Sequence, residues 1–265
     1  MNWILTMMAS LTTATMALAD GSSNVPFRVG ERLSYVIFWG PFVAGRASLE
    51  VTGIEQVDGY DCYHLVAEAR TSGLADLLYH VETKNESWLD VNELCTRQYR
   101  EKRTEGKHIR NGETRYDYVT KQASTSNHVT GKVRSIPLEA PVQDMISSLY
   151  FVRTKPLEVD VSQNLTVNVG ETNYSVNLRP DLRKTMYFRP TGDVEALRIE
   201  PSPTLNVVAA NKGRMWLWVS DDFRRLPLLV VSDMKIGSAK LVLTKIETIA
   251  PVADKPRAQA TPPDH

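Results

Sequence analysis

The sequence is poor in the residues and motifs that usually mark an enzyme. It holds only two cysteines, and its five histidines lie singly along 265 residues. It contains neither the G-x-S-x-G motif of serine hydrolases nor the H-E-x-x-H motif of zinc peptidases. The short ligand spacings of a zinc site are missing as well. We therefore expect a non-enzymatic binding protein with no catalytic residues, no metal and no cofactor.

An excess of charge of either sign is also missing. Lys plus Arg and Asp plus Glu both total 31, so the formal net charge is zero. A dedicated nucleic-acid binder carries a strongly basic surface, and this balance argues against that class. Beyond residue 19 no apolar run is long enough for a membrane helix. We expect that the chain has no nucleic-acid partner and is not an integral membrane protein.

The N-terminal segment is typical of a secretory signal peptide. Residues 4–16 are mostly apolar but too short to span a bilayer. Ala17-Leu18-Ala19 then has the pattern of a cleavage site before Asp20. We expect a signal peptide at residues 1–19, a leader at residues 20–29, and a periplasmic or secreted mature chain.

The two cysteines raise the question of a disulfide. In an oxidising compartment Cys62 and Cys95 could pair, and closing that loop would stabilise the fold by roughly 3–4 kcal/mol. The alternative is two buried free thiols that pack as small apolar side chains. Sequence leaves both possibilities open, because it does not give the distance between the two Cα atoms.

Short apolar segments separated by turn residues indicate an all-β fold. The clearest are residues 215–219, 226–231 and 239–246, joined at Asp221-Asp222 and at Gly237. The first of them is apolar at every position, so both of its faces should be covered.

Similar segments recur along the rest of the chain. Gly45 inside a strand predicts a close backbone approach, Asn111-Gly112 predicts a hairpin turn, and residues 77–82 are interpreted as strand. We expect a single domain at residues 30–249, an antiparallel barrel or curved half-barrel. The proline-rich, polar residues 250–265 predict a disordered tail.

One segment breaks the β pattern. Val142, Met145, Ile146, Leu149 and Val152 have helical spacing. We predict one short α-helix at about 142–152, which packs against the sheet or covers the opening of the barrel.

Three stretches carry a family resemblance. They are GERLSY with WG and AGRA between residues 30 and 47, DMISSLYFVR at 144–153, and GRMWLWVSDD at 213–222 with Leu226-Pro227 and Ile236-Gly237-Ser238. Together they resemble the bacterial exported family catalogued as domain of unknown function 3108. The resemblance implies an envelope location and a curved antiparallel β architecture, loosely like lipoprotein-carrier half-barrels. It implies no reaction, and the shared residues look structural.

Aromatic and apolar side chains supply the candidate ligand site. If the sheet curls, alternate residues of its strands face a concave interior that can enclose a small ligand. We expect a lipid or another apolar or amphipathic ligand near five residues: Trp39, Trp216, Trp218, Met145 and Leu149. The alternative is that these residues fill a solid core with no cavity.

The most basic stretch, residues 97–115, gives a second hypothesis. It could bind an anionic polymer, a lipid headgroup or an envelope protein through Arg97, Arg100, Lys102 and Arg103. The chain would then be a structural or adaptor protein of the envelope that acts through this hairpin and its sheet edges. The alternative is a solvated hairpin whose charges keep an exposed edge from pairing.

Overall fold

The computed structural model describes residues 25–203, 214–234 and 237–249. In this part of the chain the strands form one 13-stranded and one 3-stranded antiparallel sheet. The predicted signal peptide with its cleavage site at Ala19 and Asp20, and the predicted tail, lie outside the described residues.

The large sheet is continuous from one edge strand to the other. Its strands, in spatial order, are β11 (Pro180–Phe188), β12 (Gly192–Ile199), β14 (Met215–Ser220), β15 (Pro227–Met234), β16 (Gly237–Thr248), β1 (Glu31–Trp39), β2 (Phe42–Val57), β3 (Tyr60–Thr71), β4 (Val81–Asp90), β5 (Thr96–Glu105), β6 (His108–Asp117), β7 (Gln122–Asn127) and β8 (Val133–Pro137). The small sheet consists of β13 (Ser202–Pro203), β10 (Thr172–Leu178) and β9 (Gln163–Val169). The helices in the described residues are α1 (Leu74–Leu78) and α2 (Ser147–Arg153).

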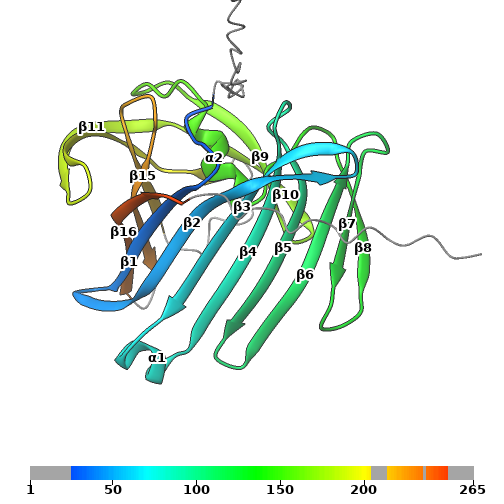
Figure 1. The fold of residues 1–265 in the computed structure, drawn as a ribbon, viewed down its shortest axis with the longest axis horizontal. Coiled ribbons are helices and arrows are strands. Elements are labelled where there is room, and N and C mark those ends of the chain that lie inside the picture. Colours follow the sequence, from blue (N-terminus) through cyan, green and yellow to red (C-terminus); the bar gives the residue numbers. More distant parts are fainter. Residues whose placement is uncertain (1–24, 204–213, 235–236, 250–265) are drawn as a thin grey trace, which may run out of the picture.

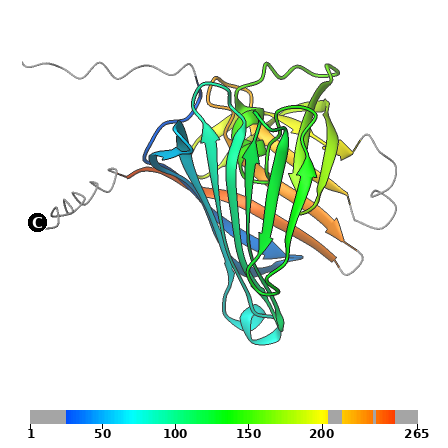
Figure 2. The same cartoon turned by 90° about the vertical axis from the view of Figure 1, so that its right-hand side faces the viewer.

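The predicted all-β class is confirmed, in the open, curved form. Within the described residues β11 and β8 remain edge strands, so the sheet does not close into a barrel. It curls around α2 at one end, while α1 lies at the far end of the long strands (Figure 1; Figure 2).

The predicted helix exists but begins later than residue 142. The backbone of Gln143 forms an isolated parallel bridge with β9, in which its N–H donates to the Thr166 carbonyl at 2.8 Å. Asp144 Oδ1 then accepts the backbone N–H groups of Ile146 and Ser147 at 2.7 and 2.9 Å. Such a side-chain turn satisfies the first free donors of a helix, which therefore starts at Ser147.

The short α2 joins the two halves of the core. Tyr150 packs in a cluster with Val51 of β2 and Leu65 of β3. Val152, two residues further along, packs in another with Leu217 of β14 and Leu165 of β9. Burying large apolar side chains on both sides stabilises a helix that is too short to be stable alone.

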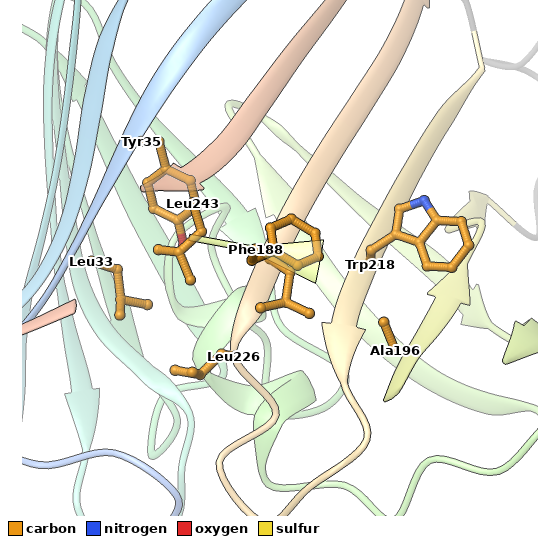
Figure 3. Packing of buried hydrophobic residues seen from close by; sticks show 8 residues of the cluster. Leu33, Tyr35, Phe188, Ala196, Trp218, Leu226 and Leu243 are labelled. Atoms are coloured by element: carbon orange, nitrogen blue, oxygen red, sulfur yellow. The ribbon is translucent and has the colours of Figure 1, made fainter. Parts of the chain in front are cut away.

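Strand β14 is covered on both faces, as its sequence predicts. Leu217 and Val219 pack toward α2, whereas Trp218 belongs to a cluster with Leu33 and Tyr35 of β1 (Figure 3). The close approach predicted at Gly45 is also confirmed, because a Cβ there would lie 2.2 Å from the Arg70 carbonyl oxygen.

Two local predictions are wrong. The strand expected at residues 77–82 is not continuous. Residues 77 and 78 belong to α1, residues 79 and 80 form a connection, and β4 begins only at Val81. Asn111 and Gly112 lie inside β6, paired with Lys102 and Glu101, and the turn falls at Gly106, where φ is +55°. The backbone torsion that a turn requires is supplied by the earlier glycine.

Candidate functional site

A hollow lies across β16 and β1–β5. It has a volume of about 810 Å³, within the usual range for small-molecule sites. Its walls come mostly from alternate strand positions: Arg32, Ser34 and Val36 on β1, Arg46 and Ser48 on β2, Glu68 and Arg70 on β3, Glu82 and Lys84 on β4, and Lys102 and Thr104 on β5. Alternate residues of a strand share one face, so these side chains project to the same side of the sheet.

This side is the face opposite α2. On β2, Val51 packs in the cluster that includes Ile146 and Tyr150. Arg46 and Ser48 occupy positions of the opposite parity on the same strand, with no register shift between them and Val51. The hollow is therefore separate from the packed interior around α2.

Cations outnumber anions on its walls. Six Lys or Arg residues face three Glu residues. Arg46 is directly opposite Arg70 in the β2–β3 register, and Lys84 is directly opposite Lys102 in the β4–β5 register. Like charges directly opposite each other destabilise a sheet, and an anion held between them would offset that repulsion.

Half of the six cations already have an anionic partner. Arg32 contacts Glu50 at 3.0 Å, Lys84 contacts Glu86 at 3.3 Å, and Lys245 contacts Glu247 at 2.6 Å. Within residues 25–203, 214–234 and 237–249, no ion pair includes the other three: Arg46, Arg70 and Lys102. These three are available to an anionic ligand.

The hollow also has an apolar part and a neighbouring hollow. Val36 and Ile249 line the same space as the charged residues. A neighbouring hollow of about 500 Å³ shares Arg46, Arg70 and Glu82 with it and extends to Asp76 and His80 beside α1. Apolar and cationic walls together suit a molecule with a greasy body and an acidic group.

The structure does not bring the five predicted ligand residues together, and none of them lines this hollow. Trp218 is buried in the core, as the alternative of a filled interior predicts. Leu149 packs beside the cluster around α2. Trp216 is half-buried under the Arg214 guanidinium, which lies 4.7 Å from the centre of its ring. Trp39 at the end of β1 and Met145 in the turn before α2 are exposed.

The structure divides the four predicted residues of the basic patch: Arg100 and Lys102 share one face of β5, Arg103 lies on the other face, and Arg97 is buried. Arg97 is only 7% exposed; it contacts Asp90 at 2.8 Å and stacks on Tyr60 at 3.6 Å, so the prediction that it belongs to a surface patch is wrong. Lys102 lines the hollow.

The remaining two basic residues sit on opposite faces of β5. Arg100 contacts Glu113 at 2.7 Å and lies over the Trp88 ring. Arg103 contacts Glu105 at 3.3 Å. The parity of their positions on the strand puts them on different sides of the sheet.

Cys62 and Cys95 are both buried and free, which is the second of the two alternatives that the sequence leaves open. Burial raises the pKa of the Cys62 thiol to about 12, and the nearby Asp90 carboxylate acts in the same direction. Burial also raises the pKa of Cys95. Both groups are therefore poor nucleophiles, because the reactive form of cysteine is the thiolate.

A second polar cluster surrounds Asp144, but it is closed to ligands. Asp144 Oδ2 accepts the hydroxyls of Ser87 and Thr96 at 2.5 and 2.9 Å, and all three residues are fully enclosed. Burial raises the pKa of Asp144, although the hydrogen bonds from Ser87 and from the backbone of Ser147 and Ile146 act to lower it. This cluster holds the approach to α2 in place.

Sequence reasoning missed Arg46 and Arg70. The available signal was the alternation of charged residues along predicted strands, as in Glu68 and Arg70 or Glu82 and Lys84. Alternation shows that such residues share a face, but it does not show which residue of the next strand lies opposite.

Neither helix of the described residues is long and apolar enough to cross a membrane.

The family model described as "Protein of unknown function (DUF3108)" matches residues 34–244. Among solved structures, the chain is similar to the crystal structure of a β-barrel-like protein of domain of unknown function DUF1849 from Brucella abortus. The two share 9% sequence identity with a TM-score of 0.54, over 84% of this chain and 99% of that chain, so the likeness is one of fold. No curated protein matches the sequence.

Proposed function

Because this chain belongs to the DUF3108 family of proteins of unknown function, we propose its role from geometry: it binds, without chemical conversion, an amphipathic ligand that carries an acidic group. The charged hollow is the site. Arg46 and Arg70 hold the acidic group, with Lys102 further along the wall, and Val36 and Ile249 contact the apolar part.

The observation that carries this proposal is the Arg46–Arg70 pair. The two guanidinium groups belong to directly opposite residues, no ion pair includes either within the described chain, and both line the same hollow. Arginine presents several N–H donors in a planar fork that matches carboxylate and phosphate oxygens. An acidic group between the two would receive charge-assisted hydrogen bonds from both sides.

Export to the cell envelope is a further part of the proposal. It rests on the apolar residues 4–16 and on the Ala17-Leu18-Ala19 pattern before Asp20. An adaptor role through the basic hairpin has less support, because Arg97 is buried and Arg100 and Arg103 face opposite sides of β5.

Binding is tested with a dansylated fatty acid and its uncharged methyl ester, by titration of dansyl fluorescence. We expect the acid to bind the wild type more tightly than the ester. In the double variant Arg46→Gln/Arg70→Gln, affinity for the acid should fall about tenfold or more, since hydrogen bonds to charged groups contribute about 1.5–3 kcal/mol each. Affinity for the ester should change little.

Arg134→Gln is the matched control. Arg134 is exposed on β8, pairs with Glu171 at 2.8 Å and lies outside the hollow, so its loss should leave both affinities unchanged. The proposal is contradicted if neither probe binds the wild type, or if the double variant binds the acid as the wild type does.

A further inference from the structure

One end of the large sheet carries an unusual number of exposed apolar side chains. On α1, Leu74, Leu77 and Leu78 are 79%, 84% and 86% exposed, and no residue of this helix is buried. The first residues of β2 and β6 and the end of α1 add four more. We call this group the apolar rim: Phe42, Val43, Leu74, Leu77, Leu78, Tyr79 and Ile109. Gathered apolar side chains on a surface mark a place where something else binds.

The rim spans three consecutive connections at the same end of the sheet. These are the β1–β2 turn, the β3–α1–β4 connection and the β5–β6 turn. Backbone hydrogen bonds join them: Ser72 N–H donates to the Ala44 carbonyl at 3.0 Å, and Gly106 N–H donates to the His80 carbonyl at 2.8 Å. In both cartoon views α1 projects at the end of the molecule away from α2 (Figure 1; Figure 2).

The projecting leucines are held outward by an ordered connection. Asp76 accepts the Thr71 hydroxyl at 2.6 Å and contacts His80 at 2.8 Å. Thr71 in turn accepts the Val81 N–H at 2.9 Å, which closes the connection at its base. The Tyr79 ring lies against Gly106, where an added Cβ would come within 3.1 Å of it. The exposure is therefore built into the fold.

Basic side chains flank the rim. Lys107 and Arg110 are exposed beside the β5–β6 turn, and no ion pair of the described residues includes them. Two of the acidic neighbours have partners: Asp76 binds Thr71 and His80, and Glu105 pairs with Arg103. A set of apolar side chains at turn tips with free cations beside them complements an anionic bilayer, whose interior accepts apolar side chains without needing a matching shape.

We propose that this end of the sheet docks on a membrane surface that contains anionic lipids. The rim enters the boundary between headgroups and acyl chains, and Lys107 and Arg110 contact the headgroups. The hollow that ends at Asp76 and His80 then opens next to the bilayer. Docking does not depend on what that hollow binds.

The test is co-sedimentation of the mature chain, expected to begin at Asp20, with vesicles of phosphatidylglycerol and phosphatidylcholine or of phosphatidylcholine alone. We expect binding to the anionic vesicles. Leu77→Ser/Leu78→Ser should reduce partitioning about tenfold or more, because two large apolar side chains lose their contact with acyl chains. Lys107→Glu/Arg110→Glu should reduce it about tenfold on anionic vesicles and much less on neutral ones.

Phe223→Ser is the matched control for the leucines. Phe223 is 70% exposed in the β14–β15 turn, outside the rim, so its replacement should leave vesicle binding unchanged. Unaltered thermal midpoints verify that each variant is folded. Equal partitioning of wild type and Leu77→Ser/Leu78→Ser would overturn the proposal. So would a dimer that dissociates in that variant, because the rim would then be covered by a second copy of the chain.

Discussion

A few buried polar residues organise this molecule at the scale of single side chains. Arg153 of α2 donates to Glu31 at 2.6 and 3.0 Å and also to the carbonyls of Pro26 and Arg224. It thereby joins the segment before β1 to the β14–β15 turn. These residues lie in or beside the stretches that carry the family resemblance. Their role in the structure is to position α2, which agrees with the expectation that the shared residues are structural.

Asp144 allows a pH prediction. Burial raises its pKa in the folded protein above the value in the unfolded chain. Between those two pKa values only the folded state holds the proton, so the free energy of unfolding falls as pH rises through that window. Compared with Asp144→Asn, which does not titrate, the wild type should therefore gain stability as pH is lowered from neutral toward the ordinary Asp pKa.

Urea unfolding of both proteins across that pH range measures the difference directly. The contributions of all other titrating groups cancel between the two proteins. A wild type that instead loses stability relative to Asp144→Asn on acidification would mean that the folded state prefers the carboxylate.

At the scale of elements, β2 does most to shape the candidate site. It pairs with both β1 and β3, carries Arg46 and Ser48 into the hollow and sends Val51 into the core around α2. Its Gly45 lies against the backbone of β3 next to Arg70. The spacing of the two arginines therefore depends on close contact between these strands.

Two glycines on β2 provide a matched pair of variants. Gly45→Ala would place a Cβ 2.2 Å from the Arg70 carbonyl oxygen, whereas a Cβ at Gly53 meets nothing within 4 Å. We expect Gly45→Ala to lower the free energy of unfolding by roughly 1–3 kcal/mol, the range typical of overpacking. Gly53→Ala should have little effect. Denaturant unfolding measures the free energy of unfolding of both variants. Equal values for Gly45→Ala and Gly53→Ala would show that β2 and β3 can move apart at Gly45 without cost.

For the whole molecule, the two ends of the large sheet differ in character. Around α2 its strands enclose apolar clusters and the small sheet, and around α1 they leave apolar side chains exposed. The hollow lies on the opposite face and reaches the α1 end. The molecule therefore has a packed end at α2 and an exposed end at α1, and the proposed membrane contact is made by the exposed end.

Export is the prediction that concerns the whole chain. When the chain is expressed in a Gram-negative bacterium with its natural N-terminus, the mature protein should appear in the periplasmic fraction. N-terminal sequencing should begin at Asp20, because signal peptidase requires small residues such as Ala17 and Ala19 before the cut. Ala19→Lys should block cleavage and leave the precursor. A chain that keeps Met1 and stays in the cytoplasm would contradict the prediction.

The sequence by itself determined the features that depend on neighbours along the chain. The apolar segments located most strands, helical spacing located α2 to within one or two turns, and Gly45 marked a close approach. Local rules failed where a longer-range partner decided the outcome. Gln143 pairs with β9 in place of joining the helix, and Gly112 pairs within β6 in place of forming a turn.

Only the tertiary structure decided where the functional surfaces lie. Arg46 and Arg70 become neighbours because the β2–β3 register places them opposite each other, and the apolar rim exists because three turns meet at one end of the sheet. Trp218 enters the core and Arg97 turns inward to Asp90 for the same reason. Register and curvature arise from contacts between residues distant in sequence, and no local pattern in the chain records them.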